Sequence, residues 1–173
     1  FKTIRSKRNT MIVPETNFKI KSGPDWDDLE TSEIFVEKRV LIVSLPGAFT
    51  PVCSSKQLPA YDKFYEEILS KGIDEIYILS VNDYYVMRAW FTELGIKNVK
   101  FIPDGDGSFT RDMDMLVNKP EQGFGMRSWR YAMIVDNRKV EKIFIEPGKN
   151  HLSNDNDPYV ESTPEKILDY LNS

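Results

Sequence analysis

The sequence is poor in the residues from which several common kinds of site are built. Its 173 residues include one cysteine, Cys53, and one histidine, His151. A single cysteine excludes an internal disulfide, and with it the disulfide-stapled scaffolds of small secreted proteins. His151 lies in a polar stretch away from the cysteine, so neither a zinc site nor a cysteine–histidine pair has local support. We expect His151 to be solvated, and we expect no metal and no cofactor.

The chain also lacks an excess of positive charge and a long apolar run. Lys and Arg together number 23 and Asp and Glu 27, for a formal net charge of −4. No chain-wide positive field therefore exists to attract nucleic acid or an acidic membrane. No apolar run approaches the roughly 18 to 20 residues that cross a bilayer. We expect a soluble intracellular protein, in the cytoplasm or in an organelle such as a mitochondrion or plastid, that binds neither nucleic acid nor membrane.

Nothing in the sequence marks a boundary between domains. It contains no internal repeat, no low-complexity tract and no linker rich in Gly, Ser or Pro. Hydrophobic residues make up 40% of the chain, enough for one core and hardly enough for two. We expect a single domain over residues 1–173. Residues 1–10 are basic and free of acids, and we expect a flexible arm or the remnant of a transit peptide there.

The central part of the chain alternates buried strands with helices. Residues 40–45 and 76–81 are nearly continuous apolar, β-branched runs, the pattern of strands buried on both faces. Helical spacing of apolar residues predicts helices over about 54–71 and 84–94, ended by Gly72 and Gly95, and residues 99–102 predict a further strand. Strand–helix–strand succession implies right-handed parallel crossovers.

The C-terminal part predicts a hairpin and a last helix. Residues 131–135 and 140–145 flank the turn-prone segment 136–139. Thr163 offers a capping hydroxyl before Pro164 and Glu165, which open a helix through Leu171. The fold class is therefore α/β, with a mixed β-sheet flanked by helices on both faces.

Cys53 follows a loop that leaves the first buried strand, and it opens the long helix. Unpaired backbone N–H groups and the helix dipole favour the thiolate at such a position. A lone cysteine is also a common inert core residue, so position alone does not assign chemistry. The loop 46–52 adds two prolines, a glycine and the hydroxyl of Thr50, three residues before the thiol.

This loop carries a specific resemblance. The run Pro46-Gly47-Ala48-Phe49-Thr50-Pro51-Val52-Cys53-Ser54 is similar to the active-site signature of the peroxiredoxin-5 subgroup of peroxiredoxins, which contains Pro-x-x-x-Thr-x-x-Cys. The resemblance continues in Leu58-Pro59, in residues 79–83 with Trp90, and in residues 127–132. It covers about residues 40–147, and both ends more loosely.

The resemblance implies a thioredoxin-like fold and a thiol peroxidase. It implies that Cys53 is the peroxidatic cysteine, that Thr50 and Pro46 shape the peroxide pocket, and that Arg130 is the active-site arginine. Arg127 is the weaker candidate for that last role. A donor and a fixed cation beside the sulfur suit the reaction, because negative charge grows on the departing peroxide oxygen. The pattern thus predicts a peroxidase acting on hydrogen peroxide and small alkyl hydroperoxides, in antioxidant defence and redox homeostasis.

The sequence departs from many relatives of this subgroup in having no second, resolving cysteine. The sulfenic acid that forms on Cys53 must therefore condense with an outside thiol before further peroxide oxidises it irreversibly. We expect glutathione or glutaredoxin, rather than thioredoxin, to be the reducing partner. Members of the resembled subgroup often dimerise near the active-site loops, so a homodimer involving Phe49 and Phe124 is kept as the lesser alternative to ordinary core packing.

The sequence also allows three other interpretations. A disulfide oxidoreductase is disfavoured, because Ser54-Ser55-Lys56 follows the cysteine in place of a dithiol motif. A redox sensor, in which oxidation of Cys53 changes partner binding without turnover, stays open. Residues 104–108 look like the start of a calcium loop, but Phe109 and Met115 stand where glycine and glutamate are required, so we expect a tight turn.

Overall fold

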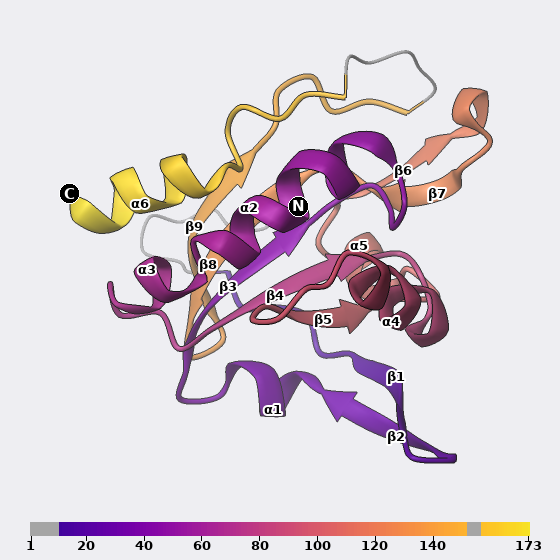
Figure 1. Cartoon of the computed structure of the whole chain (residues 1–173), viewed down its shortest axis with the longest axis horizontal. Coiled ribbons are helices and arrows are strands. Elements are labelled where there is room, and N and C mark those ends of the chain that lie inside the picture. Colours follow the sequence, from indigo (N-terminus) through magenta and orange to yellow (C-terminus); the bar gives the residue numbers. More distant parts are fainter. Residues whose placement is uncertain (1–10, 152–156) are drawn as a thin grey trace.

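The computed structural model describes residues 11–151 and 157–173. The expected arm or transit-peptide remnant at 1–10 lies outside the described residues, as do residues 152–156 (Figure 1). Within the described part, the strands and helices follow in chain order: β1 (Asn17–Ser22), β2 (Asp25–Glu30), α1 (Thr31–Phe35), β3 (Arg39–Ser44), a π-helical turn (Cys53–Gln57), α2 (Leu58–Lys63), α3 (Tyr65–Leu69), β4 (Glu75–Ser80), α4 (Tyr84–Glu93), β5 (Lys100–Pro103), α5 (Ser108–Asp112), β6 (Leu116–Lys119), a 3₁₀ turn (Pro120–Gln122), β7 (Gly125–Ser128), β8 (Tyr131–Asp136), β9 (Lys139–Ile145) and α6 (Pro164–Asn172).

A five-stranded mixed sheet forms the centre of the molecule. Its strand order is β5-β4-β3-β8-β9. The strands β3, β4 and β5 are parallel, as the crossovers predicted, and β8 and β9 add in antiparallel register. The hairpin between β8 and β9 turns at Asn137 and Arg138, whose φ angles of 48° and 73° are those of the turn type that matches strand twist. The predicted central strand, mixed sheet and hairpin are confirmed.

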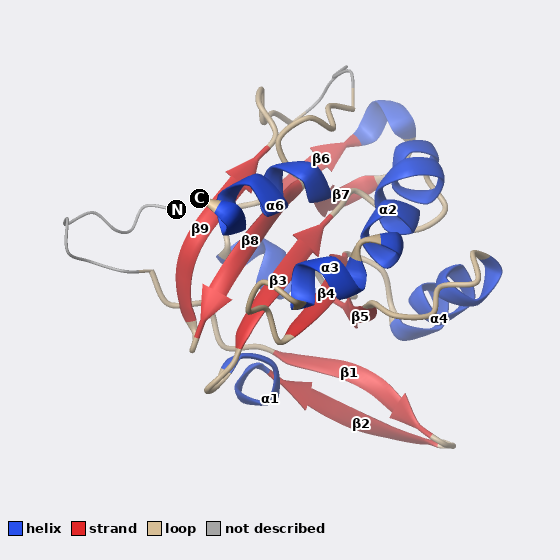
Figure 2. Cartoon of the chain, turned by 60° about the vertical axis from the view of Figure 1, so that its left-hand side comes forward, coloured by secondary structure: helices blue, strands red, loops and turns tan. Residues whose placement is uncertain are grey.

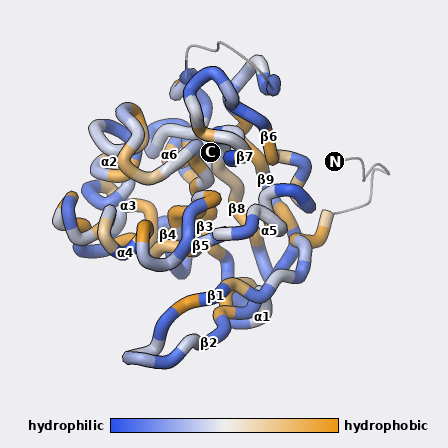
Figure 3. Tube along the Cα trace, turned by 90° about the vertical axis from the view of Figure 1, so that its right-hand side faces the viewer, coloured by the Kyte–Doolittle hydropathy of each residue, from blue (hydrophilic) through white to orange (hydrophobic). Residues whose placement is uncertain are grey.

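Helices cover both faces of this sheet, and β3 contributes to the core on each side. Leu41 and Val43 pack in one core, under α2, α3, α4 and α6. Val40 and Ile42 pack in the other, with residues of α1, α5 and β1. Figure 2 shows α2, α3 and α6 in front of the sheet, and Figure 3 shows the hydrophobic trace concentrated along the central strands. The side-chain alternation of one strand thus serves two cores.

The predicted helix over 54–71 is present but is not one regular helix. It opens with a π-helical turn in which the Leu58 N–H donates to the Cys53 carbonyl, five residues back. It breaks again at Phe64, whose ψ of 10° separates α2 from α3. Apolar spacing does not distinguish these turns, because α- and π-helical residues keep nearly the same face toward the core over a single turn. The departure matters, since π-helical turns concentrate at functional sites.

The N-terminal hairpin of β1 and β2 was not predicted. Most of its residues are exposed or half-buried, and only Phe18 is buried in the core. The strands hold together by antiparallel pairing from Asn17 with Glu30 to Ser22 with Asp25. A strand with little burial lacks the apolar alternation from which strands are recognised. In Figure 1 this hairpin projects from the edge of the molecule beside α1.

In the described part of the chain, no helix is long and apolar enough to cross a membrane, and no group of three His, Cys, Asp or Glu side chains could hold a metal ion. The loop at 104–108 is a turn closed by the buried Asp104, whose carboxylate accepts hydrogen bonds from the backbone N–H groups of Phe109 and Thr110. His151 is exposed, and its Nδ1 accepts a hydrogen bond from the backbone N–H of Asn118.

Candidate active site

The loop between β3 and the π-helical turn brings Cys53 to the carboxyl end of the central strand. Phe49 adopts a φ of 65° in this loop, and the Thr50 hydroxyl donates to the Gly47 carbonyl at 2.7 Å. The Thr50 carbonyl in turn accepts from the Ser54 N–H at 2.9 Å. Cys53 therefore stands in the first helical turn with Thr50 beside it. The carboxyl end of a parallel strand is where α/β folds usually place ligands.

The Cys53 side chain is buried in the protein. The residue has 0% of its surface exposed. Burial raises the pKa of the thiol, and this effect outweighs the opposing influence of the Arg130 charge, the Thr50 hydroxyl and the Gly47 backbone. Burial therefore opposes the helix start, which was expected from the sequence to favour the thiolate. A buried sulfur depends on nearby donors and cations to become ionised.

Arg130 supplies the nearest such cation. Its side chain is 2% exposed, and its Nη2 lies 3.5 Å from the Cys53 sulfur. The same Nη2 forms an ion pair with the Asp157 carboxylate at 2.7 Å, and Nη1 donates to the carbonyls of Pro158 at 2.9 Å and Asp157 at 3.4 Å. The guanidinium is therefore held in one orientation by the segment that begins at Asp157. A rigid, permanently charged group suits this place beside a thiolate.

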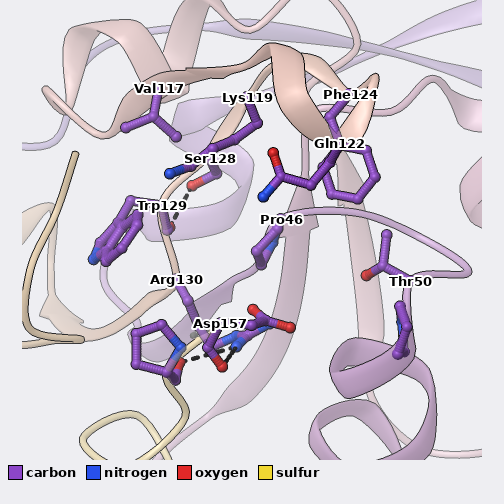
Figure 4. Close-up of a pocket in the computed structure, with 12 residues that line it drawn as sticks. Pro46, Thr50, Val117, Lys119, Gln122, Phe124, Ser128, Trp129, Arg130 and Asp157 are labelled. Atoms are coloured by element: carbon purple, nitrogen blue, oxygen red, sulfur yellow. Dashed lines mark hydrogen bonds and ion pairs between the residues drawn. The ribbon is translucent and has the colours of Figure 1, made fainter. Parts of the chain in front are cut away.

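A small pocket opens beside these residues. It has a volume of about 190 Å³, and its walls include Pro46, Thr50 and Arg130. Figure 4 shows the Arg130 guanidinium joined to Asp157 below Pro46, with Thr50 on another wall and Phe124 above. Cys53 itself does not line the open part of the pocket. Three of the four predicted site residues therefore surround a cavity, and the fourth, Cys53, contacts Arg130 Nη2 at 3.5 Å.

Arg127, the weaker candidate in the sequence, contacts the loop that leads to Cys53. Its Nη1 donates to the Pro46 carbonyl at 3.0 Å, and its guanidinium lies over the Phe124 ring at 4.9 Å. A Cβ on Gly47 would come within 2.0 Å of the same Nη1, so the glycine is needed for this close approach. Burial lowers the pKa of Arg127, and the charge of Cys53 opposes that effect. Arg127 thus braces the loop, whereas Arg130 contacts the sulfur.

Several residues that support the site were missed in the sequence. Asp157 and Pro158 come from a stretch that reads only as polar loop, yet they hold the guanidinium of Arg130. Ser54, directly after the thiol, accepts a hydrogen bond from Trp90 Nε1 of α4 at 2.8 Å. No spacing rule connects these positions, because they meet only when the C-terminal loop and α4 pack onto the sheet. The run of Asp and Asn before Pro158 gave no signal beyond a turn.

Comparison with known proteins places the chain in a family. Residues 9–160 match the model of the Redoxin family. A peroxiredoxin of Rhizobium etli is 52% identical, over 92% of this chain and 93% of its own length. The hybrid peroxiredoxin hyPrx5 of Haemophilus influenzae is 47% identical, and this chain spans 64% of its length. A solved structure, the Plasmodium falciparum antioxidant protein (1-Cys peroxiredoxin), superposes with a TM-score of 0.88 at 36% identity, covering 95% of this chain and 99% of the other.

These matches agree with the thiol, guanidinium and hydroxyl that meet at the end of the central strand. They also carry the reaction class, because peroxiredoxins are peroxidases that use a cysteine thiol. The chain belongs to the Redoxin family and is a peroxiredoxin, a thiol-dependent peroxidase with a thioredoxin-like fold and one cysteine.

Proposed function

We propose that this peroxiredoxin reduces hydrogen peroxide and small alkyl hydroperoxides with Cys53, and that an outside thiol regenerates the cysteine. The observation that carries the proposal is the contact of 3.5 Å between Arg130 Nη2 and the Cys53 sulfur, in a buried site beside the Thr50 hydroxyl. A cation and a hydroxyl fixed around a nucleophile are already oriented for the charge that the reaction develops.

The first step transfers one oxygen to the sulfur. The Cys53 thiolate attacks the terminal oxygen of the peroxide, an S–O bond forms, and the O–O bond breaks. The departing oxygen takes the bonding electron pair and a proton, leaving as water or an alcohol, and Cys53 becomes a sulfenic acid. Arg130 stabilises first the thiolate and then the developing oxyanion. Thr50, whose hydroxyl now donates to the Gly47 carbonyl, is placed to donate to the peroxide instead.

The dimensions of the site favour small substrates. The sulfur is fully buried and the neighbouring pocket holds about 190 Å³, so a hydroperoxide must fit its reacting oxygen into a narrow space. Pro46, Val117, Phe124 and Trp129 give the pocket an apolar wall. That wall suits the short alkyl group of a small organic hydroperoxide as well as hydrogen peroxide.

Regeneration needs a thiol from outside, because the chain has no second cysteine. The thiol of glutathione or glutaredoxin forms a mixed disulfide with the sulfenic acid and releases water, and a second thiol then frees the Cys53 thiolate as the disulfide of the two reducing thiols leaves. The likeness to the Plasmodium falciparum 1-Cys peroxiredoxin supports this one-cysteine route. Because the sulfur is buried, the π-helical turn must shift before an outside thiol can reach it. Glutathione is smaller than thioredoxin and therefore needs a smaller shift.

Stopped-flow oxidation tests both halves of the proposal. The reduced protein is mixed with hydrogen peroxide, and the sulfenic acid is then offered glutathione alone, glutathione with glutaredoxin, or thioredoxin with its reductase. We expect rapid oxidation that Cys53→Ser abolishes, and turnover with the glutathione systems. Ser55→Ala, which changes an exposed hydroxyl on the same turn, serves as the matched control. Equal steady-state turnover without any thiol contradicts the recycling scheme, and turnover with thioredoxin alone contradicts the choice of reductant.

We also propose a homodimer that covers Phe49. This side chain is 54% exposed in the active-site loop, an unusual position for a phenylalanine beside a functional segment. Sedimentation analysis of the wild type and of Phe49→Glu tests the proposal. We expect the charged variant to shift the equilibrium toward the monomer, and a wild type that sediments as a monomer at all concentrations contradicts it.

A further inference from the structure

Glu146 carries a buried carboxylate that the peroxidase reaction, as described above, does not use. The residue directly follows β9 and has 0% of its surface exposed. Among the residues that the structure describes, no lysine or arginine forms an ion pair with it. Burying a carboxylate without hydrogen bonds is very costly. The hydrogen bonds that compensate for this burial therefore show which part of the protein Glu146 holds in place.

Five hydrogen bonds converge on this carboxylate from one short segment. Oε1 accepts from the backbone N–H groups of Val160 at 2.8 Å and Glu161 at 3.1 Å. Oε2 accepts from the N–H groups of Glu161 at 2.9 Å and Ser162 at 2.8 Å, and from the Ser162 hydroxyl at 2.7 Å. Consecutive N–H groups around one anion form a strong and directional anchor. Glu146 therefore fixes residues 160–162 against the end of β9.

The segment anchored in this way also orients Arg130. Two residues before Val160, the Pro158 carbonyl accepts from Arg130 Nη1, and Asp157 pairs with Nη2. Arg130 Nε has no hydrogen-bond partner in the described structure. The direction of the guanidinium thus depends on its two Nη groups, and one set of their partners is the segment that Glu146 holds.

The backbone of Glu146 also contacts Arg130 and its neighbour Trp129. Its N–H donates to the Arg130 carbonyl at 3.2 Å, and its own carbonyl accepts from Trp129 Nε1 at 2.8 Å. Glu146 thus lies opposite Arg130 across the β8–β9 pairing, while its side chain holds the segment that holds the guanidinium. Glu146 therefore contacts the main chain of Arg130 directly and fixes its side chain through residues 157–162.

We propose that Glu146 is a positioning residue of the peroxidase, which acts through residues 157–162 to keep the Arg130 guanidinium on the Cys53 sulfur. The inference rests on the proposed role of Arg130 in the reaction. Glu146 touches neither peroxide nor sulfur, so its effect is indirect. A displacement of the guanidinium by about 1 Å is enough to reduce the rate by up to about 100-fold.

The test replaces Glu146 with glutamine. Glu146→Gln keeps the size of the side chain, but its Nε2 cannot accept from the surrounding N–H groups. We expect the rate constant of Cys53 oxidation by hydrogen peroxide to fall about 10- to 100-fold, and the thiol pKa, measured by thiolate absorbance at 240 nm, to rise. Glu146→Asp, which keeps the charge on a shorter stem, is expected to give an intermediate rate and replaces the glutamine variant if that variant does not fold.

A matched control separates this role from general loss of stability. Glu141→Gln makes the same change on β9, where Glu141 pairs with Arg39 at 2.7 Å and accepts from the Tyr170 hydroxyl. We expect it to lower the midpoint of urea unfolding and to leave the oxidation rate and the thiol pKa unchanged. An equal fall in oxidation rate in both variants overturns the proposal, because the effect would then follow from stability alone.

The double variant with Arg130→Met decides whether Glu146 acts through the arginine. If it does, Glu146→Gln slows oxidation in the wild-type background and has little further effect once Arg130 is gone. An equal fall in both backgrounds overturns the inference. A slow Arg130→Met protein together with a fully active Glu146→Gln protein refutes this inference alone, whereas a fully active Arg130→Met protein refutes the proposed function of the site.

Discussion

Replacing Arg130 with methionine should raise the pKa of Cys53 and slow its oxidation. Methionine fills a similar volume but carries neither the charge nor the donors of the guanidinium. The change leaves the burial of the sulfur, which raises the pKa, without its main opposing influence. The thiolate fraction at neutral pH must therefore fall, and the curve of oxidation rate against pH must move to higher pH.

The expected size follows from the geometry. Two unit charges 3.5 Å apart interact by about 5 kcal/mol at an effective dielectric constant of roughly 20. The Asp157 carboxylate, 2.7 Å from the same nitrogen, carries the opposite charge and cancels part of this attraction. If about half of the interaction survives, its loss raises the pKa of Cys53 and disfavours the thiolate by about 2.4 kcal/mol. Below both pKa values the thiolate population then drops about 30- to 100-fold.

Two measurements over the same pH range check this reasoning. Absorbance at 240 nm gives the thiolate titration, and stopped-flow mixing with hydrogen peroxide gives the rate constant. Arg130→Lys is the control, since it keeps the charge and loses the two-sided fork, and it should recover much of the titration. Any rate gap that persists above both pKa values measures the stabilisation of the departing oxygen. An unchanged titration curve in Arg130→Met would refute the argument.

The remaining predictions concern the loop and the core. Thr50→Val should slow peroxide oxidation about 10-fold, the worth of one well-placed hydrogen bond, whereas Thr50→Ser should stay near the wild-type rate in the same stopped-flow assay. Gly47→Ala should cost about 0.5 to 1.5 kcal/mol in urea unfolding, because the new methyl group would lie 2.0 Å from Arg127 Nη1 and displace the guanidinium from the Pro46 carbonyl; an unchanged midpoint would count against that contact. Leu41→Ala, on the fully buried face of β3, should cost about 2 to 5 kcal/mol without altering the thiol pKa.

The parts of the fold that could be predicted from the sequence are those that bury apolar side chains in regular repeats. The strands β3 and β8 are continuous runs of such residues and are buried along almost their whole length, so their pattern directly reports burial on two faces. The β1–β2 hairpin could not be predicted from apolar patterning, because it is held by backbone pairing and buries few side chains. The π-helical turn at Cys53 could not be predicted either. Its hydrogen bond spans five residues instead of the four of an α-helix, a difference that apolar spacing does not resolve.

The site divides in the same way. Cys53, Thr50 and Pro46 lie within one stretch of eight residues, so a local sequence motif is enough to identify all three. Arg130 came from resemblance, since nothing in its neighbourhood signals a contact with position 53. The depth of the sulfur in the protein was not foreseen, because helix-start position reports hydrogen-bond geometry and not solvent access. Asp157 reaches the site only through the tertiary path of the C-terminal loop.

The hydrogen bond from Trp90 to Ser54 makes Trp90 an intrinsic fluorescence probe of the active site. The indole of Trp90 is fully buried, and its Nε1 is attached to the residue that follows Cys53. Any shift of the π-helical turn must break or bend that attachment and so change the emission of the indole. Trp26, which is 55% exposed on the β1–β2 hairpin, and Trp129, which is 4% exposed in the pocket wall, also emit, and replacing both with phenylalanine isolates the signal of Trp90. Any shift of the turn that accompanies oxidation or reduction of Cys53 can therefore be timed by intrinsic fluorescence, without a label.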